Sequence, residues 1–326
     1  MSKKSGDWRP NMTPYEIAPS KVLRFPGDLS RLKAGIPPSV LNEEVDLSET
    51  CQLACASCDF PNHYPAHMNL DLAGQTASTL ERWGTKAVVF SGGGEPTMCP
   101  DFAPITALFS QSAQLGLYTN GVRSVFADVA DRFRWVFVSL DAASADEWAA
   151  YKRAPAGWYA KVLENIGAAA QGTTVGVGFL IGEHNYQRIE TMARVGLEAG
   201  ASYVRFRPMY PSQDAIWQHD AIPILERVSA WGHVSVAWHK FHDVWHWERP
   251  YDTCWASMFL RLVDAEGTVW ACPTTRGKRR LGNIATYEGL RQPLAVTDEC
   301  RPCCRGHEMN LLLDYVMRSG PHDYFV

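Results

Sequence analysis

The chain has 326 residues, 46% of them hydrophobic and 20% charged, and a formal net charge of −4 at pH 7. This composition is typical of a globular protein that is long enough to bury a core without disulfides. The negative charge argues against a nucleic-acid partner, and no apolar stretch approaches the ~18 residues of a membrane span. The start, MSKKSGDWRP, lacks the apolar segment of a secretory signal. We therefore expect a cytoplasmic protein that binds neither nucleic acid nor membranes.

Short apolar runs alternate with amphipathic stretches from about residue 44 to residue 207. The runs are rich in Val and Phe, as expected for strands buried on both faces of a parallel sheet. They are Val45–Leu47, Ala87–Phe90, Leu115–Tyr118, Trp135–Leu140, Val175–Ile181 and Tyr203–Phe206. The intervening segments have helical spacing, as in Tyr159, Val162, Leu163 and Ile166. Six β-α repeats with right-handed crossovers predict an α/β fold with a curved or barrel-like parallel sheet.

Both ends of the chain depart from this repeat. Residues 1–43 contain several prolines and little periodicity, which indicates an N-terminal arm or cap. Beyond about residue 235, two apolar runs around Glu266-Gly267 predict a β-hairpin, and Asn310–Val316 has the pattern of a helix. We expect three parts: the arm or cap (1–43), the β-α core (44–235) and a small C-terminal α+β domain (236–326).

The nine cysteines form two groups. Clustered cysteines in a reducing compartment are more often metal ligands or catalysts than disulfides. The first group is Cys51, Cys55 and Cys58, and the second is Cys254, Cys272, Cys300, Cys303 and Cys304. Cys99 stands alone and is expected to be a small buried apolar residue.

The first group has the spacing Cys51-x3-Cys55-x2-Cys58 and directly follows the first predicted strand. Thiolates are the usual ligands of iron–sulfur clusters, and three of them leave one iron of a [4Fe–4S] cluster open to a small chelating molecule. The alternatives are a zinc site or three unrelated buried cysteines. Structural zinc sites prefer four ligands in CxxC pairs, so a single triplet fits them poorly.

Polar residues at the ends of successive predicted strands give this sequence a resemblance to the radical SAM superfamily over about residues 44–207. The triplet matches the family's CxxxCxxC motif, and the segment after the second strand resembles its GGE motif, whose backbone meets the amino group of S-adenosylmethionine (SAM). The resemblance implies SAM contacts from Gly92, Gly93, Gly94, Glu95, Asn120, Ser139 and Asp141. It also implies a partial (β/α)6 TIM-like barrel with its ligands at the C-terminal ends of the strands. Ser139 and Asp141 alternate along a strand, so we expect them to point the same way.

One position departs from the family pattern. The residue before the third cysteine is usually aromatic or aliphatic and packs against adenine, but here it is Ser57. That contact is expected from elsewhere, for example from Phe60.

Three arginines are further candidates for ligand binding. Arg153 lies where some relatives place a group that binds the SAM carboxylate; otherwise it is a solvated helix charge. Arg205 and Arg207 alternate on the sixth strand, so both side chains face the same side. If that side is the barrel interior, the pair suits a phosphate or carboxylate; if it is the exterior, they are surface charges.

The second cysteine group resembles the auxiliary-cluster domain found in part of the same family. Cys254, Cys272, Cys300 and Cys303 are the expected ligands of one further [4Fe–4S] cluster, as in the shorter "twitch" relative of the SPASM domain. A zinc ribbon is the alternative. Cys304 could exchange roles with Cys303, be a spare thiol, or donate a hydrogen atom to a substrate radical. The basic run Thr275–Arg280 is either a solvated loop or a contact for phosphates or an acidic electron donor.

The resemblance implies that an electron from a donor such as flavodoxin or ferredoxin cleaves SAM and that the 5′-deoxyadenosyl radical abstracts hydrogen from the substrate. We expect the substrate to be a small polar metabolite: a sugar, aminocyclitol, nucleoside or nucleotide. The alternative is a peptide that is epimerised or crosslinked. A zinc-stabilised nucleic-acid-binding protein is the alternative that is not an enzyme.

Overall fold

A single large sheet organises the computed structural model, which describes residues 19–58, 60–61, 63–209, 216–242, 249–300, 303 and 306–318. Within these residues, ten strands follow the order β11-β10-β9-β1-β2-β3-β4-β5-β6-β7. Their bounds are β1 Asn42–Asp46, β2 Ala87–Ser91, β3 Gln114–Thr119, β4 Phe133–Ser139, β5 Thr174–Ile181, β6 Tyr203–Pro208, β7 Val234–Val236, β9 Leu260–Val263, β10 Thr268–Trp270 and β11 Arg280–Asn283. All pairs from β9 through β1 to β7 are parallel, and the pairs β9–β10 and β10–β11 are antiparallel.

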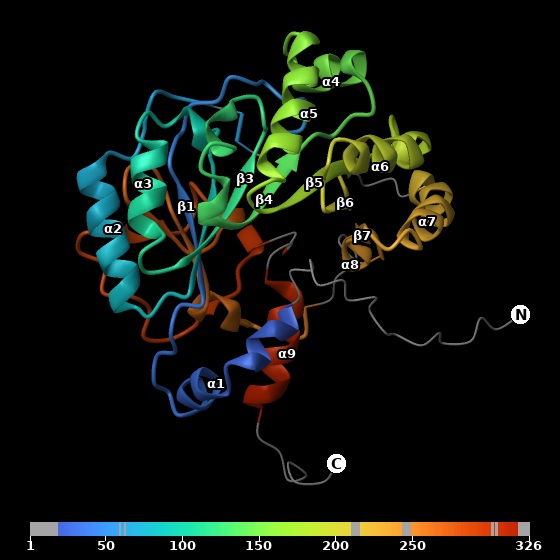
Figure 1. Cartoon of the computed structure of the whole chain (residues 1–326). Coiled ribbons are helices and arrows are strands. Elements are labelled where there is room, and N and C mark those ends of the chain that lie inside the picture. The colour runs from blue at the N-terminus through green and yellow to red at the C-terminus, as the bar shows by residue number, and fades with distance from the viewer. Residues whose placement is uncertain are drawn as a thin grey trace, which may run out of the picture.

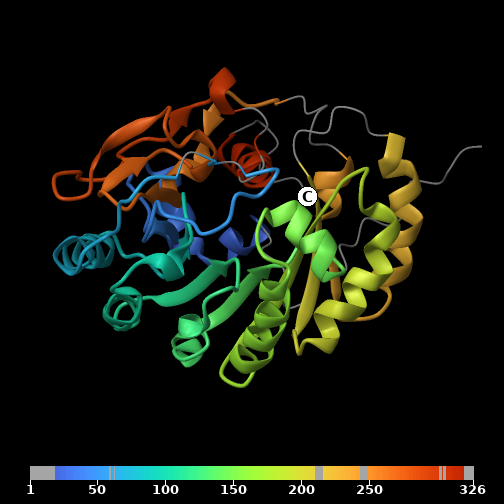
Figure 2. The same ribbon diagram turned by 90° about the horizontal axis from the view of Figure 1, so that it is seen from above.

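Helices cover one face of this sheet and form an arc around it when it is seen from above (Figure 2). They are α2 (Leu70–Arg82), α3 (Phe102–Phe109), α5 (Gly157–Ala169), α6 (Ile189–Glu198) and α7 (Ile216–Ser229), with the shorter α4 (Ala145–Lys152) above the strand ends in Figure 1 and α8 (Trp238–His242) after β7. Side chains satisfy the first amides of two of them. Asn69 accepts from the amide of Leu72 at the start of α2, and Ser144 accepts from that of Glu147 at the start of α4.

Alternation along the strands separates two faces of the sheet. Val136, Val138, Val204 and Phe206 belong to the core cluster that packs against the helices. The residues between them, such as Phe137 and Arg205, therefore face the opposite, concave side. The two faces of the strands thus have different neighbours. The outer face packs against an apolar helix layer, and the inner face is a mixed aromatic and charged surface.

The C-terminal segment continues the sheet from its β1 edge, because β9 pairs in parallel with β1. A separate two-stranded sheet joins β8 (Thr253–Cys254) to β12 (Leu294–Ala295). The last helix, α9 (His307–Met317), lies beside the 3₁₀ helix Pro19–Arg24, which leads into α1 (Pro26–Lys33; Figure 1). A small second core, built from Val22, Leu32, Met258, Phe259 and Leu313, joins these helices to the C-terminal segment.

Sequence and structure agree on the α/β class and on the six strands of the core, each within a few residues. The expected hairpin is β9–β10, and the expected terminal helix is α9. Two features differ: β7 adds a further parallel strand, and the segment before β1 contains the helix α1. The boundary expected at 235/236 falls inside β7, and the division into three parts stays a prediction. No helix in the described part of the chain has both the length and the apolar character needed to span a bilayer.

Candidate functional site

The cysteine triplet lies in the loop that follows β1, and all three cysteines are half-buried. The end of α4 holds this loop by two backbone hydrogen bonds, from the amide of Ala54 to the carbonyl of Lys152 (3.1 Å) and from that of Ala56 to the carbonyl of Tyr151 (3.0 Å). The amide of Cys58 donates to the carbonyl of Cys55. These bonds keep the three thiols in one short loop at the C-terminal edge of the sheet.

The glycine run after β2 packs directly against the cysteine loop. The amide of Gly94 donates to the carbonyl of Ser48 (2.9 Å) and that of Glu95 to the carbonyl of Thr50 (2.8 Å). A Cβ atom on Gly94 would overlap the carbonyl of Thr50, so no other residue fits this close approach. The predicted GGE motif and the cysteine triplet are therefore brought together.

Glu95 is buried and binds the end of the neighbouring strand rather than an open space. Its Oε1 atom accepts from the Thr119 hydroxyl (2.6 Å) and from the amide and hydroxyl of Thr97, and its Oε2 atom accepts from the amide of Asn120 (2.7 Å). Burial raises the pKa of Glu95, although these donors oppose the rise. The Asn120 side chain lies 3.8 Å from the sulfur of Cys51. Glu95 thus positions Asn120 beside the triplet.

The carboxylate of Asp141 also binds groups of the protein itself. We expected Ser139 and Asp141 to point the same way because they alternate along a strand. Strand β4 ends at Ser139, however, and Asp141 has a φ of +62°, so the strand alternation does not extend to residue 141. Its carboxylate accepts from Lys152 Nζ (2.6 Å) and from the amide of Leu180 (2.8 Å). The inference from strand alternation was wrong because the backbone leaves the extended conformation.

Lys152 is the residue that the sequence analysis missed. It is 3% exposed, and its pKa is raised because Asp141 and Cys55 outweigh the opposing effect of burial. Arg153, the residue that we expected here, is exposed and has a φ of +53° just after α4. Lys152 follows the fully buried Trp148 by four residues, so the helix places both on one face. That spacing was a usable signal.

An aromatic ring approaches Ser57 from α4. The hydroxyls of Ser57 and Tyr151 are 2.5 Å apart, and the Tyr151 ring is stacked on His184 with centroids separated by 6.3 Å. Phe60, which we expected in this role, lies instead under the guanidinium of Arg276 at 5.1 Å. Tyr151 is therefore the aromatic residue that contacts Ser57, the position where the family usually has an apolar residue.

Arg205 and Arg207 lie on the concave face of the sheet. The Arg205 guanidinium is 5.7 Å from the ring centroid of Phe137 and 5.4 Å from that of Tyr203, and Arg207 is 5.9 Å from Phe137. Arg205 is buried and Arg207 is half-buried. The two side chains share one side of β6, on the barrel interior, where such a pair suits an anionic group.

Arg276 connects the C-terminal segment to the strand that precedes the triplet. It forms ion pairs with Asp46 (2.7 Å) and with Glu49. A Cβ atom on Gly93 would overlap this guanidinium and the Glu49 carboxylate. Burial raises the pKa of Asp46 well above its usual value, and Arg276 is the main group that opposes the rise. The contact therefore ties the C-terminal segment to the start of the triplet loop.

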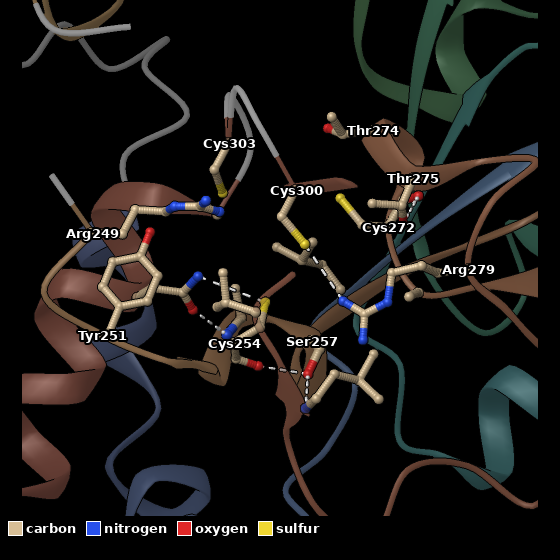
Figure 3. A pocket seen from close by; sticks show the side chains of 17 residues that line it. Arg249, Tyr251, Cys254, Ser257, Cys272, Thr274, Thr275, Arg279, Cys300 and Cys303 are labelled. Atoms are coloured by element: carbon tan, nitrogen blue, oxygen red, sulfur yellow. Dashed lines mark hydrogen bonds between the residues drawn. The ribbon is translucent and has the colours of Figure 1, made fainter. Parts of the chain in front are cut away.

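Four of the five C-terminal cysteines line one pocket (Figure 3). Cys254 ends β8, Cys272 follows β10, Cys300 ends a short 3₁₀ turn, and Cys303 follows it. The pocket encloses roughly 550 Å³ of unfilled space, part of it open to solvent. Cys304 lies outside the described residues.

The donor atoms around this pocket suit a cluster better than a single ion. Within the described residues, no three Cys, His, Asp or Glu side chains converge closely enough to hold one metal ion, as a zinc ribbon requires. Four thiols around a wider space fit a [4Fe–4S] cluster. Burial raises the pKa of Cys254, whereas for Cys300 hydrogen bonds from Thr297 and Arg279 outweigh burial and lower the pKa.

The triplet region fits a cluster for a different reason. Its three thiols share one loop, and the glycine run packs closely against that loop. Burial raises the pKa of Cys51 to about 11 and also raises the pKa of Cys55. The charge of Lys152 opposes the rise at Cys55. Metal binding requires the deprotonated thiolates, so Lys152 is placed to stabilise them.

Comparison with known proteins finds a family match over part of the chain and relatives over most of it. Residues 45–195 match the family model described as the Radical SAM superfamily. The chain is 27% identical over 275 residues to the mycofactocin maturase MftC of Mycobacterium ulcerans, which covers 76% of this chain and 72% of that protein. Its fold is similar to Streptococcus suis SuiB bound to the precursor peptide SuiA (TM-score 0.63, 12% identity, 86% of this chain and 71% of that one). It is also similar to anSMEcpe with bound AdoMet and the Kp18Cys peptide (TM-score 0.59, 16% identity, 76% and 78%). Residues 45–195 thus form a region that matches the radical SAM superfamily, and the chain is a radical SAM enzyme.

Proposed function

We propose that this enzyme modifies a peptide and that residues 236–326 form an auxiliary domain whose cysteines hold a second [4Fe–4S] cluster. One observation carries the proposal of a second cluster: Cys254, Cys272, Cys300 and Cys303 come from three separate segments and line one pocket. All four are half-buried, and a shared cluster would account for their convergence. The triplet Cys51, Cys55 and Cys58 is proposed to hold the cluster that binds SAM.

The choice of a peptide rests on the relatives and on the shape of the sheet. Two of the solved structures with this fold contain peptides, a precursor peptide in SuiB and Kp18Cys in anSMEcpe. Among the residues that the structure describes, the sheet has free edges at β11 and β7, so that part of the barrel does not close. An open concave face lined by aromatic rings and arginines can accept an extended chain. These findings favour the peptide over the small metabolite that we first expected.

The residues around the triplet have separate roles in this proposal. When bound, the cluster and SAM together supply the 5′-deoxyadenosyl radical that removes a hydrogen atom from the substrate. Gly92, Gly93 and Gly94 let the backbone after β2 pack closely against the cysteine loop, where its polar groups would meet SAM, and Asn120 is held beside Cys51 by Glu95. Lys152 lies between Asp141 and Cys55, where its charge suits the SAM carboxylate as well as the thiolates. Ser139 and Arg153 stay predictions without a structural contact that supports them.

Two features near the second pocket suit an electron donor. Lys278 and Arg280 are exposed on the loop that also contains Arg279. Flavodoxins and ferredoxins are the donor class that we expect, and an acidic donor would be attracted to these cations.

A phosphorylated small metabolite is the second candidate substrate. Arg205 and Arg207 are the observation that favours it, because guanidinium pairs bind phosphate oxygens in bidentate fashion. The same pair also suits a peptide carboxylate, so substrate assays must separate the two.

The test is substrate turnover by anaerobically reconstituted enzyme with SAM and a reductant. Short precursor peptides and nucleotide sugars are supplied in parallel, and mass spectrometry follows the substrate while chromatography follows 5′-deoxyadenosine. We expect a change in peptide mass in proportion to 5′-deoxyadenosine. Turnover of nucleotide sugars with all peptides unchanged would overturn the peptide proposal and support the second candidate.

A further inference from the structure

The basic run Thr275–Arg280 is not a uniformly solvated loop. Lys278 and Arg280 are exposed, but Arg276 is paired with carboxylates beside the triplet, and Arg279 turns to the second pocket. There Arg279 Nη1 donates to the sulfur of Cys300 at 3.4 Å (Figure 3). A cation therefore lies directly on one of the four pocket sulfurs.

A second donor contacts another sulfur of the same pocket. Asn310 is 1% exposed, and its Nδ2 atom donates to the sulfur of Cys254 at 3.6 Å. Its Oδ1 atom accepts from the amide of Ala256 at 2.8 Å. Because a backbone amide can only donate, this second bond fixes the orientation of the Asn310 side chain, and its NH₂ group must face the sulfur.

Donors at the sulfurs act on the redox equilibrium of an iron–sulfur cluster. The reduced cluster carries one more negative charge than the oxidised cluster, and part of it resides on the cysteine sulfurs. A guanidinium and an amide NH₂ therefore stabilise the reduced form more than the oxidised form, and hydrogen bonds to sulfur are among the determinants of cluster potential. Burial of the pocket limits the screening of Arg279 by solvent.

We propose that Arg279, assisted by Asn310, raises the reduction potential of the cluster bound by the second pocket and so makes that cluster an electron acceptor. This inference rests on the proposed second cluster. It assigns a function to one residue of a charge run that composition alone treats as surface. The immediate neighbour Arg280 carries the same charge but is exposed, which provides a matched control.

The experiment is a redox titration of the holoenzyme followed by electron paramagnetic resonance. The second cluster is the one whose signal does not change when SAM is added. In Arg279→Gln, the ratio of reduced to oxidised second cluster at fixed potential should fall at least tenfold, which is about 59 mV for one electron. In Arg280→Gln the shift should be much smaller, because solvent and salt screen an exposed charge.

Each outcome bears on a different statement. Equal shifts in both variants, or no shift in Arg279→Gln, would overturn the role of Arg279. If Arg279→Gln fails to retain the second cluster, the measurement is made on Asn310→Asp instead. This substitution keeps the acceptor for the Ala256 amide and removes the donor to the Cys254 sulfur, so the reduction potential of the second cluster should fall. An unchanged potential would overturn the inference. A wild-type enzyme with about four irons per chain instead of eight would contradict the proposed second cluster itself.

Discussion

The two cysteine regions of this chain differ in where their nearby cations are directed. Beside the triplet, Lys152 is tied to Asp141 and Arg276 to Asp46 and Glu49, so carboxylates neutralise the cations. In the second pocket, Arg279 donates to the sulfur of Cys300 itself. Similar thiols are thus placed in opposite electrostatic surroundings.

Among the thiol pKa values, only that of Cys300 follows this division, because burial raises the pKa of Cys254 in the second pocket as it does at the triplet. Burial raises the pKa of Cys51 to about 11, whereas hydrogen bonds from Thr297 and Arg279 leave that of Cys300 below its usual value despite burial. A site that disfavours added negative charge suits a strongly reducing cluster, and a site that favours it suits an electron acceptor. The comparison therefore predicts a lower potential at the triplet than in the second pocket.

Removal of single cysteines should separate the two sites most strongly. In Cys55→Ala we expect SAM cleavage to fall to background, because the iron that binds SAM depends on the triplet. In Cys300→Ala we expect SAM cleavage to continue and substrate oxidation to be lost. Iron analysis and 5′-deoxyadenosine release measure both, and Cys99→Ala, a change in the core, is the control with full iron. Equal loss of SAM cleavage in both cluster variants would contradict two separate roles.

Arg276→Leu tests the carboxylates on the triplet side. The substitution leaves the buried Asp46 and Glu49 without their cation, so the free energy of unfolding should fall by about 3–5 kcal/mol. Urea unfolding measures this loss, and the exposed Arg280→Leu should change it by less than about 0.5 kcal/mol.

The deficit of Arg276→Leu should also grow with pH. A carboxyl whose folded pKa lies above its unfolded value contributes stability below the unfolded pKa and loses it as the pH rises through the folded pKa. Burial already raises the pKa of Asp46 above 3.8, and loss of Arg276 raises it further. The variant should be closest to wild type near pH 5 and furthest from it near pH 8. A deficit that is constant over this range would show that Asp46 is not responsible.

Contiguous motifs were readable from sequence, whereas side-chain directions were not. The six core strands were predictable because burial on both faces makes each an apolar run, and the triplet was predictable because its three cysteines share one loop. The pairing of β9 with β1 joins segments more than 200 residues apart, and β7 has three residues, so neither leaves a local pattern. The second pocket was predictable as a group of cysteines but not as a shape.

Charged residues were the least predictable part of the site. The resemblance indicated Arg153 and passed over Lys152, although the helical spacing from Trp148 favours Lys152. A basic run indicates positive charge but does not show where each side chain points. Only the structure could therefore show that Arg276 and Arg279 contact two different sites. Asp141 was misread because the backbone turns left-handed just after β4.

Lys152→Met tests whether the buried cation on the triplet side is structural. Asp141 would keep a buried charge without its partner, so the free energy of unfolding should fall by about 3 kcal/mol. Adding Asp141→Asn should restore part of the loss, because asparagine tolerates a positive φ and carries no charge. Arg153→Met is the matched control, since that side chain is exposed. If Lys152→Met and Arg153→Met weaken SAM binding equally, Lys152 has no special place beside the triplet.

Tyr151→Phe should have the smallest effect and tests a neutral contact of the triplet loop. The change removes one hydroxyl, and with it the bond to Ser57, while the ring stacked on His184 remains. The free energy of unfolding should therefore fall by about 1 kcal/mol. Tyr315→Phe, at a side chain that is 82% exposed, should leave it unchanged. Both variants should retain the midpoint potential of the triplet cluster, because neither changes a charge or a sulfur contact. A lowered potential in Tyr151→Phe would mean that polar contacts of the loop, and not only the carboxylate-bound cations, set the electrostatics of the triplet.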